Sequence, residues 1–318
     1  MVAKNIIYWL LFILACFFSS CEKTVTIDAP EAEIKPVINC LFEDEKPFKV
    51  NVSMTKAPSD SGFVVVEHAQ VEISGDDGTS VSLGYAGNGC YSDSSMLPQK
   101  GVTYTLSVKI TGFDEITATN KIPEQVVSVN EVTSLTGSKT VSAMGLGENP
   151  NIPVQVVTVK FEQDVNYRDY LGVSANIFAV IHHYVNDSIF VTEDTLKLVS
   201  GFLESNDPAI LNEGLDKYDE YNLLLFKDDV FVQKNSTIQF NVEKLIQSKY
   251  WIRIMQLSPE AYTYIKSWVI HRATQEYDFW EAYEPQPLYS NIKNGYGIFA
   301  GYSMQNFEVF PDSTVVFK

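Results

Sequence analysis

Short runs of alternating apolar and polar residues, separated by turn residues, constrain the fold of this chain more than any other feature. Residues 48–52 and 104–108 alternate strictly, and two shorter runs at 70–73 and 81–83 flank the sequence Asp77-Gly78. Alternation has the two-residue period of a half-buried strand, and Asp-Gly between two such runs is a strong hairpin signal. Because these runs show no helical period, they predict a mainly β fold.

Turn residues and strand lengths divide the chain into two predicted β domains. Residues 36–123 predict an N-terminal immunoglobulin-like antiparallel β-sandwich, and Pro123 marks its end. A larger, mainly β C-terminal domain is predicted over residues 124–318, with strands at 154–161, 171–181, 188–199, 238–242, 251–257 and within 296–317. Residues 134–153 are rich in Gly, Ser, Asn and Pro, which predicts a mobile loop.

One amphipathic helix interrupts the β pattern. Ser258-Pro259-Glu260 has the residues of a helix start, namely a capping Ser, a Pro at the first helical position and an acid in the first turn. The pattern predicts a helix near residues 259–275 that covers one face or end of the second sheet. Its apolar face is expected to consist of Ala261, Ile265, Trp268 and Val269.

Residues 1–20 predict a cleaved secretory signal peptide. Lys4 precedes an unbroken apolar run of 13 residues at 6–18, and Ser19, Ser20 and Cys21 close it. A bilayer-spanning helix needs about 20 residues, so the run favours a signal over a permanent membrane span. Two kinds of signal fit this segment. One is a signal in which Cys21 receives lipid, and the alternative is an ordinary secretory signal in which Cys21 stands by chance.

Ser-Ser-Cys at this position resembles the lipobox of bacterial lipoproteins. The resemblance implies lipidation at Cys21 with palmitate-type acyl chains, a mature chain that begins there, and a polar tether over residues 21–35. Two or more acyl chains anchor a protein stably, since each buried CH₂ contributes about 0.8 kcal/mol. Glu22, which is not Asp, favours sorting to the outer membrane by the same resemblance.

The charge balance is strongly acidic. Loss of residues 1–20 removes Lys4 and no acid, which leaves 22 basic against 40 acidic residues and a charge of −18. A nucleic-acid backbone requires clustered Lys and Arg, so this balance argues against nucleic acid as a partner. Apolar residues make up 45% of the chain, which is enough to form cores and argues against disorder.

Two cysteines remain once Cys16 leaves with the signal and Cys21 carries lipid. An even pair in an oxidising compartment predicts a disulfide between Cys40 and Cys90. The loop of about 50 residues that it would close corresponds to roughly 4 kcal/mol in the chain-entropy model. The alternative is two unpaired buried thiols on neighbouring strands.

The sequence offers no strong metal, cofactor or catalytic motif. His182 and His183 are adjacent at the end of a predicted strand, where neighbouring side chains point to opposite faces, so we expect no metal site. Asp76-Asp77-Gly78 predicts a turn, because the later ligands of a Ca²⁺ loop are missing. We therefore expect no catalytic residue that can be identified from sequence, and no cofactor.

An aromatic-rich stretch near the C-terminus is the best candidate for an exposed contact loop. Exposed rings stack on sugars and anchor protein interfaces, although core packing accounts for most aromatic residues in a folded chain. The stretch from 277 to 289 is less periodic and contains two prolines. Its aromatic residues are Tyr277, Phe279, Trp280, Tyr283 and Tyr289.

Two stretches resemble a known family. One joins residues 21–33 to the patterns at 69–71, 77–78, 87–91 and 101–106, and the other joins Ser258-Pro259-Glu260-Ala261-Tyr262 to residues 289–299. Together they resemble the lipoprotein family of Bacteroidota catalogued as domain of unknown function 4249. The resemblance implies an outer-membrane lipoprotein, often encoded near TonB-dependent transporters, with no established activity.

The most specific part of this resemblance is the segment Asn-Ile-x-Asn-Gly-x-Gly-Ile-Phe. Its glycines do not match a phosphate-loop spacing, and no helix signal follows. A structural role in a tight, buried connection is the favoured interpretation, and contact with a ligand is the alternative. Its principal residues are Asn291, Asn294, Gly295, Gly297 and Phe299.

Three functions remain open from the sequence. The leading hypothesis is a non-enzymatic, lipid-anchored binding or accessory subunit beside an outer-membrane β-barrel transporter, with its ligand and its side of the membrane undetermined. The second is a surface hydrolase of glycan or peptide, which requires two carboxylates about 5–10 Å apart in a cleft. The third is a structural or adhesive module without a concave site.

Overall fold

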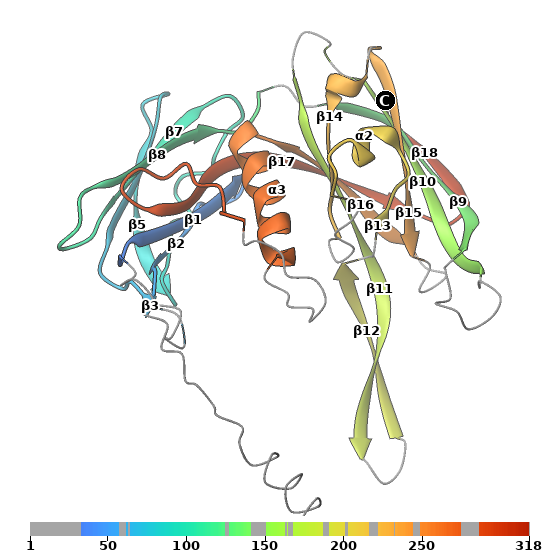
Figure 1. Ribbon diagram of the computed structural model, residues 1–318, viewed down its shortest axis with the longest axis horizontal. Helices are drawn as coiled ribbons and strands as arrows, with labels where there is room; N and C mark the ends of the chain where they lie inside the picture. The colour runs from blue at the N-terminus through green and yellow to red at the C-terminus, as the bar shows by residue number, and fades with distance from the viewer. Residues whose placement is uncertain are drawn as a thin grey trace, which may run out of the picture. The chain divides into compact units, whose positions relative to one another are not determined.

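The computed structural model describes residues 33–56, 62, 64–124, 127–140, 151–162, 164, 168–186, 191–200, 203–215, 222–231, 233–243, 249–274 and 286–317. For residues 178–186, 191–200 and 243 the backbone alone is described. Strands dominate this part of the chain (Figure 1), which confirms the mainly β prediction. The predicted signal peptide, Cys21 and most of the tether lie outside the described residues.

The first region consists of short strands that alternate as the sequence predicts. In β7, for example, Tyr104, Leu106 and Val108 are buried while the residues between them are more exposed. The strands are β1 (Pro36–Glu43), β2 (Lys49–Met54), β3 (Val64–Val65), β4 (Gln70–Gly75), β5 (Ser80–Gly87), β6 (Cys90–Ser92), β7 (Thr103–Lys109) and β8 (Ile116–Lys121). The β4–β5 hairpin turns at Gly78, whose positive φ of 87° suits glycine.

The second region has longer strands and the predicted helix. Its strands are β9 (Ser128–Thr140), β10 (Asn151–Glu162), β11 (Tyr170–Asn186), β12 (Val191–Ser200), β13 (Leu203–Glu204), β14 (Leu224–Lys227), β15 (Asn235–Glu243), β16 (Tyr250–Leu257), β17 (Tyr296–Val309) and β18 (Ser313–Val316). Its helices are α2 (Pro208–Leu211), the 3₁₀ turn η1 (Asp228–Val230) and α3 (Pro259–Ala273). The prediction of a loop over 134–153 is wrong at both ends, because β9 continues to residue 140 and β10 begins at residue 151.

One sheet runs through both regions because β17 has partners in each. It pairs in parallel with β1 through residues 296–302 and antiparallel with β16 through residues 302–309. The strand order is β12-β11-β16-β17-β1-β2-β6-β5-β4-β7-β8, with β14 also on β11 and β3 also on β2. A second sheet has the order β13-β15-β10-β9-β18.

The first-region part of the large sheet curls until its last strand, β8, returns to β17. Thr117 of β8 exchanges main-chain hydrogen bonds with Lys293, at 2.9 and 3.3 Å. Farther along, the Gly301 amide donates to Asn120 Oδ1 at 2.9 Å. The enclosed core contains Ile292 and Phe299 beside residues of β1, β2 and β4 to β8, so β17 and the segment before it complete the core of the first region.

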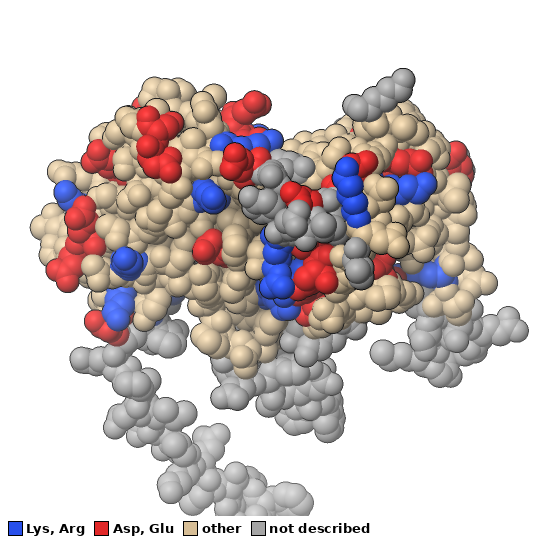
Figure 2. Space-filling model, turned by 90° about the horizontal axis from the view of Figure 1, so that it is seen from above, with Lys and Arg blue, Asp and Glu red and all other residues tan. Residues whose placement is uncertain are grey.

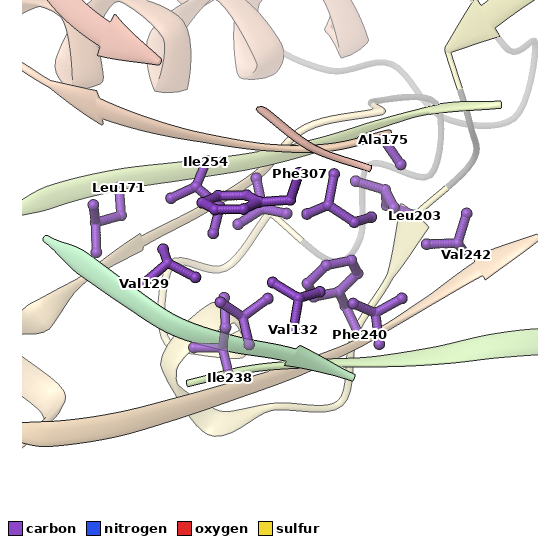
Figure 3. Packing of buried hydrophobic residues seen from close by; sticks show 14 of the residues in the cluster. Val129, Val132, Leu171, Ala175, Leu203, Ile238, Phe240, Val242, Ile254 and Phe307 are labelled. Atoms are coloured by element: carbon purple, nitrogen blue, oxygen red, sulfur yellow. The ribbon is translucent and has the colours of Figure 1, made fainter. Parts of the chain in front are cut away.

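The second core lies between the two sheets. Leu171, Ile254 and Phe307 of the large sheet face Val132 and Phe240 of the smaller one (Figure 3), and all five are buried. Polar side chains alternate with these residues along each strand, as in other packed sheets.

The predicted helix is confirmed. Ser258 caps α3, with its hydroxyl accepting from the Ala261 amide at 3.2 Å, and the helix ends at Ala273. The predicted apolar face is partly wrong, because Tyr262 is buried whereas Trp268 is 39% exposed, with the Arg272 guanidinium 5.8 Å from its ring centroid.

The predicted disulfide is not formed. Cys40 and Cys90 are both free, and Cys40 is buried. Strand β2 lies between β1 and β6, so the two Cα atoms are two strand spacings apart, about 10 Å, whereas a disulfide needs at most about 7 Å. Burial raises the pKa of the Cys40 thiol to about 12.

Candidate functional site

Among the described residues, one face of the large sheet is only partly covered in the second region. The residues that point away from the second core alternate with those that form it along β11, β16 and β17. We call this surface the outer face. It carries partly exposed Ser174, Asn176, Trp251, Arg253, Met255 and Met304, and exposed Asn306.

Helix α3 covers the neighbouring part of the same face. Ala261 and Tyr262 of α3 form a third apolar cluster with Leu257, Ile298 and Ala300 of the sheet. Glu260 at the helix start accepts from Asn120 Nδ2 at 2.7 Å, and Asn120 also holds the Gly301 amide. The helix is therefore fixed to strands of both regions.

Within the described residues, Arg253 is the central residue of the part of the outer face that α3 does not cover. It lies in β16 with Ser174 of β11 and Asn306 of β17 as its direct neighbours across the strands. With the Asn176 amide turned so that its oxygen faces the guanidinium, Oδ1 accepts from Arg253 Nη2 at 2.5 Å. The Arg253 Nε atom is buried without a hydrogen-bond partner.

The acids around this face already have partners. Glu308 pairs with Lys249 at 2.7 Å, and the Lys249 ammonium also lies 5.3 Å from the ring centroid of Trp251. Glu43 accepts from the Tyr302 hydroxyl at 3.0 Å. Burial, with the nearby Glu43 carboxylate, raises the pKa of Tyr302, while Arg253 acts in the opposite direction.

A buried ionic cluster supports the other side of α3. Glu213 accepts from Lys266 at 2.7 Å and lies 3.6 Å from Lys227, whose ammonium is 5.4 Å from the ring centroid of Tyr262. Burial favours the neutral acid, but the hydrogen bonds and the two ammonium groups outweigh it and lower the pKa of Glu213. The cluster therefore ties the segment after α2 to the helix.

Two carboxylates meet inside the second region. Asp169 and Asp228 are buried, and Asp169 accepts from the amide of Gln256, whose own oxygen accepts from the Val127 amide at 2.8 Å. Burial, with the charge of Asp228, raises the pKa of Asp169 to about 6. Both carboxylates are buried, and Gln256, which bonds Asp169, is itself buried on the side of β16 that faces the smaller sheet.

The aromatic contact stretch is described at its end alone. Tyr277, Phe279, Trp280 and Tyr283 lie outside the described residues. Tyr289 is partly buried, packs against the third apolar cluster and donates its amide to Ser267 Oγ at 2.9 Å. The end of the stretch is therefore fixed to α3, beside the outer face.

The asparagines and glycines of the family segment build the connection into β17. Asn291 Nδ2 donates to the Phe299 carbonyl at 2.8 Å, and its Oδ1 accepts from the Phe299 amide at 2.9 Å, so the side chain acts as a short strand partner. Asn294 has a φ of 60° and donates to the Glu115 carbonyl at 2.9 Å. A Cβ on Gly295 would lie 2.8 Å from the Pro36 carbonyl oxygen, and one on Gly297 would lie 2.0 Å from that of Ile38.

The histidine pair lies on the ribbon that β11 forms with β12. His182 and His183 are opposite Asp194 and Glu193, in the part of β11 that extends beyond β16 (Figure 1). The sequence predicts that the pair ends a strand, whereas β11 continues past it to Asn186. No group of three metal-ligating side chains occurs within the described residues.

A groove lies at the edge of the first region. Its volume is about 510 Å³, and the end of β2, β3, residues 66–68 and residues 110–111 line it. Its walls are mostly apolar and include the charged Glu67 and the imidazole of His68. Nothing in the described part of the chain shows what occupies it.

Sequence reasoning missed Arg253. The signal is present in the run Trp-Ile-Arg-Ile-Met, where an arginine stands on the polar side of an alternating strand. The run shows the alternation, but it does not show that the arginine lacks an acid partner.

Comparison with known proteins gives one family match. The profile of the family described as "Domain of unknown function (DUF4249)" matches residues 22–308. No curated protein matches the chain significantly. Within the described residues, no helix has the length and apolarity needed to span a membrane.

Proposed function

The chain belongs to the DUF4249 family, and from this membership and the outer face we propose that it is a lipid-anchored, non-enzymatic binding subunit of the bacterial outer membrane. Its partner in this proposal is a β-barrel transporter of the TonB-dependent type. The family resemblance also supports an origin in Bacteroidota, and the spacing of the short strands within residues 36–123 supports an immunoglobulin-like form for the first region.

The outer face is the observation that carries this proposal. Trp251, Arg253 and Met304 are partly exposed on a sheet face beside α3, and side chains of these types are enriched at the centres of protein interfaces. Tyr289, at the described end of the aromatic stretch, donates its amide to Ser267 of α3. A rigid sheet with such residues is suited to binding another protein.

The N-terminal sequence supports the membrane anchor. Cys21 follows directly on the apolar run and the two small residues of the predicted signal. Acyl chains on Cys21 would hold the acidic body at the bilayer, where its charge does not favour a direct contact with anionic lipids.

Two experiments test the proposal. Affinity purification from detergent-solubilised membranes should recover a large β-barrel protein with the wild-type chain, and recovery of the chain alone in repeated trials would contradict it. The Cys21→Ala variant is the matched control for the anchor, because it should leave the membrane fraction. Retention of that variant in membranes at wild-type size would contradict lipidation.

A further inference from the structure

Arginine is rare in this protein, and the three arginines differ in their partners and in their place in the fold. The chain contains three arginines, Arg168, Arg253 and Arg272, among 23 basic residues. Arg168 pairs with Asp229 at 3.4 Å, and Arg272 stacks on Trp268. Arg253 is the arginine placed in the middle of a strand, on a sheet face.

The surroundings of Arg253 leave its positive charge without an acid. Lys249, four positions before it in the sequence, pairs with Glu308, and Lys227 on β14 pairs with Glu213. Among the described residues, no Asp or Glu forms an ion pair with Arg253, although the chain has many more acids than bases. On the face that Figure 2 shows, several basic side chains lie beside acidic ones.

A partly buried guanidinium without a carboxylate is unfavourable in the isolated protein. Its Nε is buried and has no acceptor, and the desolvation of a charge costs free energy that a paired anion would offset. Asn176 holds one edge of the guanidinium, so the group is already oriented before any ligand arrives. A planar fork in a fixed orientation matches the two oxygens of a carboxylate.

The neighbours of Arg253 indicate what kind of molecule could present a carboxylate to its guanidinium. Ser174 and Asn306 flank it across the strands and supply hydrogen-bonding groups, while Trp251 and Met255 flank it along β16. The polar neighbours can hydrogen-bond a peptide backbone, and the aromatic and thioether side chains can contact apolar residues. This combination matches a polypeptide in which an acidic residue stands between apolar ones. Such a surface is less suited to a small, highly charged anion.

We propose that Arg253 is the anchor of the outer face and binds the carboxylate of an Asp or Glu side chain presented by the partner protein. This inference rests on the proposed function, since it names the chemistry by which that face would recognise its partner.

A pair of short peptides tests this chemistry directly. The probes are Ac-Ala-Phe-Glu-Phe-Ala-NH₂ and the same peptide with Gln in place of Glu, added to ¹⁵N-labelled protein lacking residues 1–21. With three arginines, the Nε–Hε region of the spectrum is sparse, and the Arg253→Lys variant assigns the Arg253 signal. The Glu peptide should shift that signal saturably and bind at least threefold more tightly than the Gln peptide, with Arg168 and Arg272 as internal controls.

The same titration defines failure. An equal response to the two peptides, no shift of the Arg253 signal, or an equal shift of all three arginines would overturn the proposal. The Arg253→Met variant keeps the aliphatic volume and removes the charge, so it should lose the preference for Glu. Its melting temperature without ligand should equal or exceed that of the wild type, and a clear decrease would show that Arg253 serves the fold instead.

Affinity purification separates this inference from the proposed function. If the wild type recovers a partner and Arg253→Met loses at least tenfold of it, both stand, provided that the exposed control Lys121→Met keeps the partner. If both variants recover it equally, the role of Arg253 is wrong and the binding function stands. If the wild type recovers no partner, the proposed function fails, and the peptide titration still decides the chemistry of Arg253.

Discussion

Replacement of Asn291 by Ala tests whether the family segment holds the last strands in place. The Asn291 side chain makes hydrogen bonds of 2.8 and 2.9 Å to the carbonyl and amide of Phe299, whose side chain is fully buried. Alanine leaves both main-chain groups without this partner, and each such group costs about 1–3 kcal/mol when it is buried. Because Asn291 is itself partly exposed and water can reach the site, we expect a loss of about 3 kcal/mol in the free energy of unfolding.

Urea unfolding followed by far-UV circular dichroism measures this loss. Asn294→Gly is the matched control, since it removes a single exposed hydrogen bond to the Glu115 carbonyl, tolerates the φ of 60° at this position and should cost less than about 1 kcal/mol. A loss below about 1 kcal/mol for Asn291→Ala, at an unchanged urea dependence, would refute the reasoning, because the side chain would then not serve as a strand partner.

Three further predictions concern buried groups. Burial and Asp228 raise the pKa of Asp169 to about 6, so the folded protein favours the neutral carboxyl more than the unfolded chain does. The stability that this neutral form contributes is fully present below about pH 4 and is lost as the pH rises through 6. Asp169→Asn should therefore stabilise the protein at pH 7.5 by about 1–3 kcal/mol and flatten its stability profile between pH 4 and 7, whereas destabilisation at pH 7.5 would contradict this. Gly297→Ala places a Cβ 2.0 Å from the Ile38 carbonyl oxygen at a φ of 109°, so it should cost more than about 3 kcal/mol or prevent folding in urea titrations; Gly112→Ala, at a φ of 89° but in open space, should cost only about 1–2 kcal/mol. Ellman's reagent should titrate two thiols in unreduced, denatured protein that begins at Glu22, and Cys90 should react before buried Cys40 in the folded protein; a count of zero would restore the disulfide.

Local sequence predicted the elements whose signals are local. The capping Ser258 and the following Pro-Glu predicted α3 to within two residues of its observed end. Alternation predicted β7, since its buried residues repeat every second position. Gly137 illustrates the limit, because residues 134–140 have the composition of a loop but each of them pairs with a residue of β10.

Long-range pairing explains what local sequence could not predict. Nothing within residues 296–302 indicates that their partner is β1, about 260 positions earlier. The same pairing places Phe299 in the core of the first region, so the division at Pro123 separates strands that share a core. The disulfide prediction used the number of cysteines and had no information about β2 between them.

The candidate site shows the same division. The segment around Asn291 was recognisable, and the structure supplies the contacts that its residues make. The role of Arg253 could not be predicted from the sequence, because its lack of an acidic partner depends on strands β11, β16 and β17 lying side by side.

The parallel pairing of β17 with β1 also sets the order in which the protein can fold. Phe42 and Phe48 are made early, but the ring of Phe299, which packs on Phe42 at a centroid distance of 4.8 Å, is synthesised 257 residues after Phe42 (299 − 42). Until then the early strands lack one wall of their hydrophobic interior, and closing so long a loop is slow. A nascent or truncated chain would thus expose aromatic surface and depend on chaperones, whereas the completed chain would acquire both cores in one late, cooperative step.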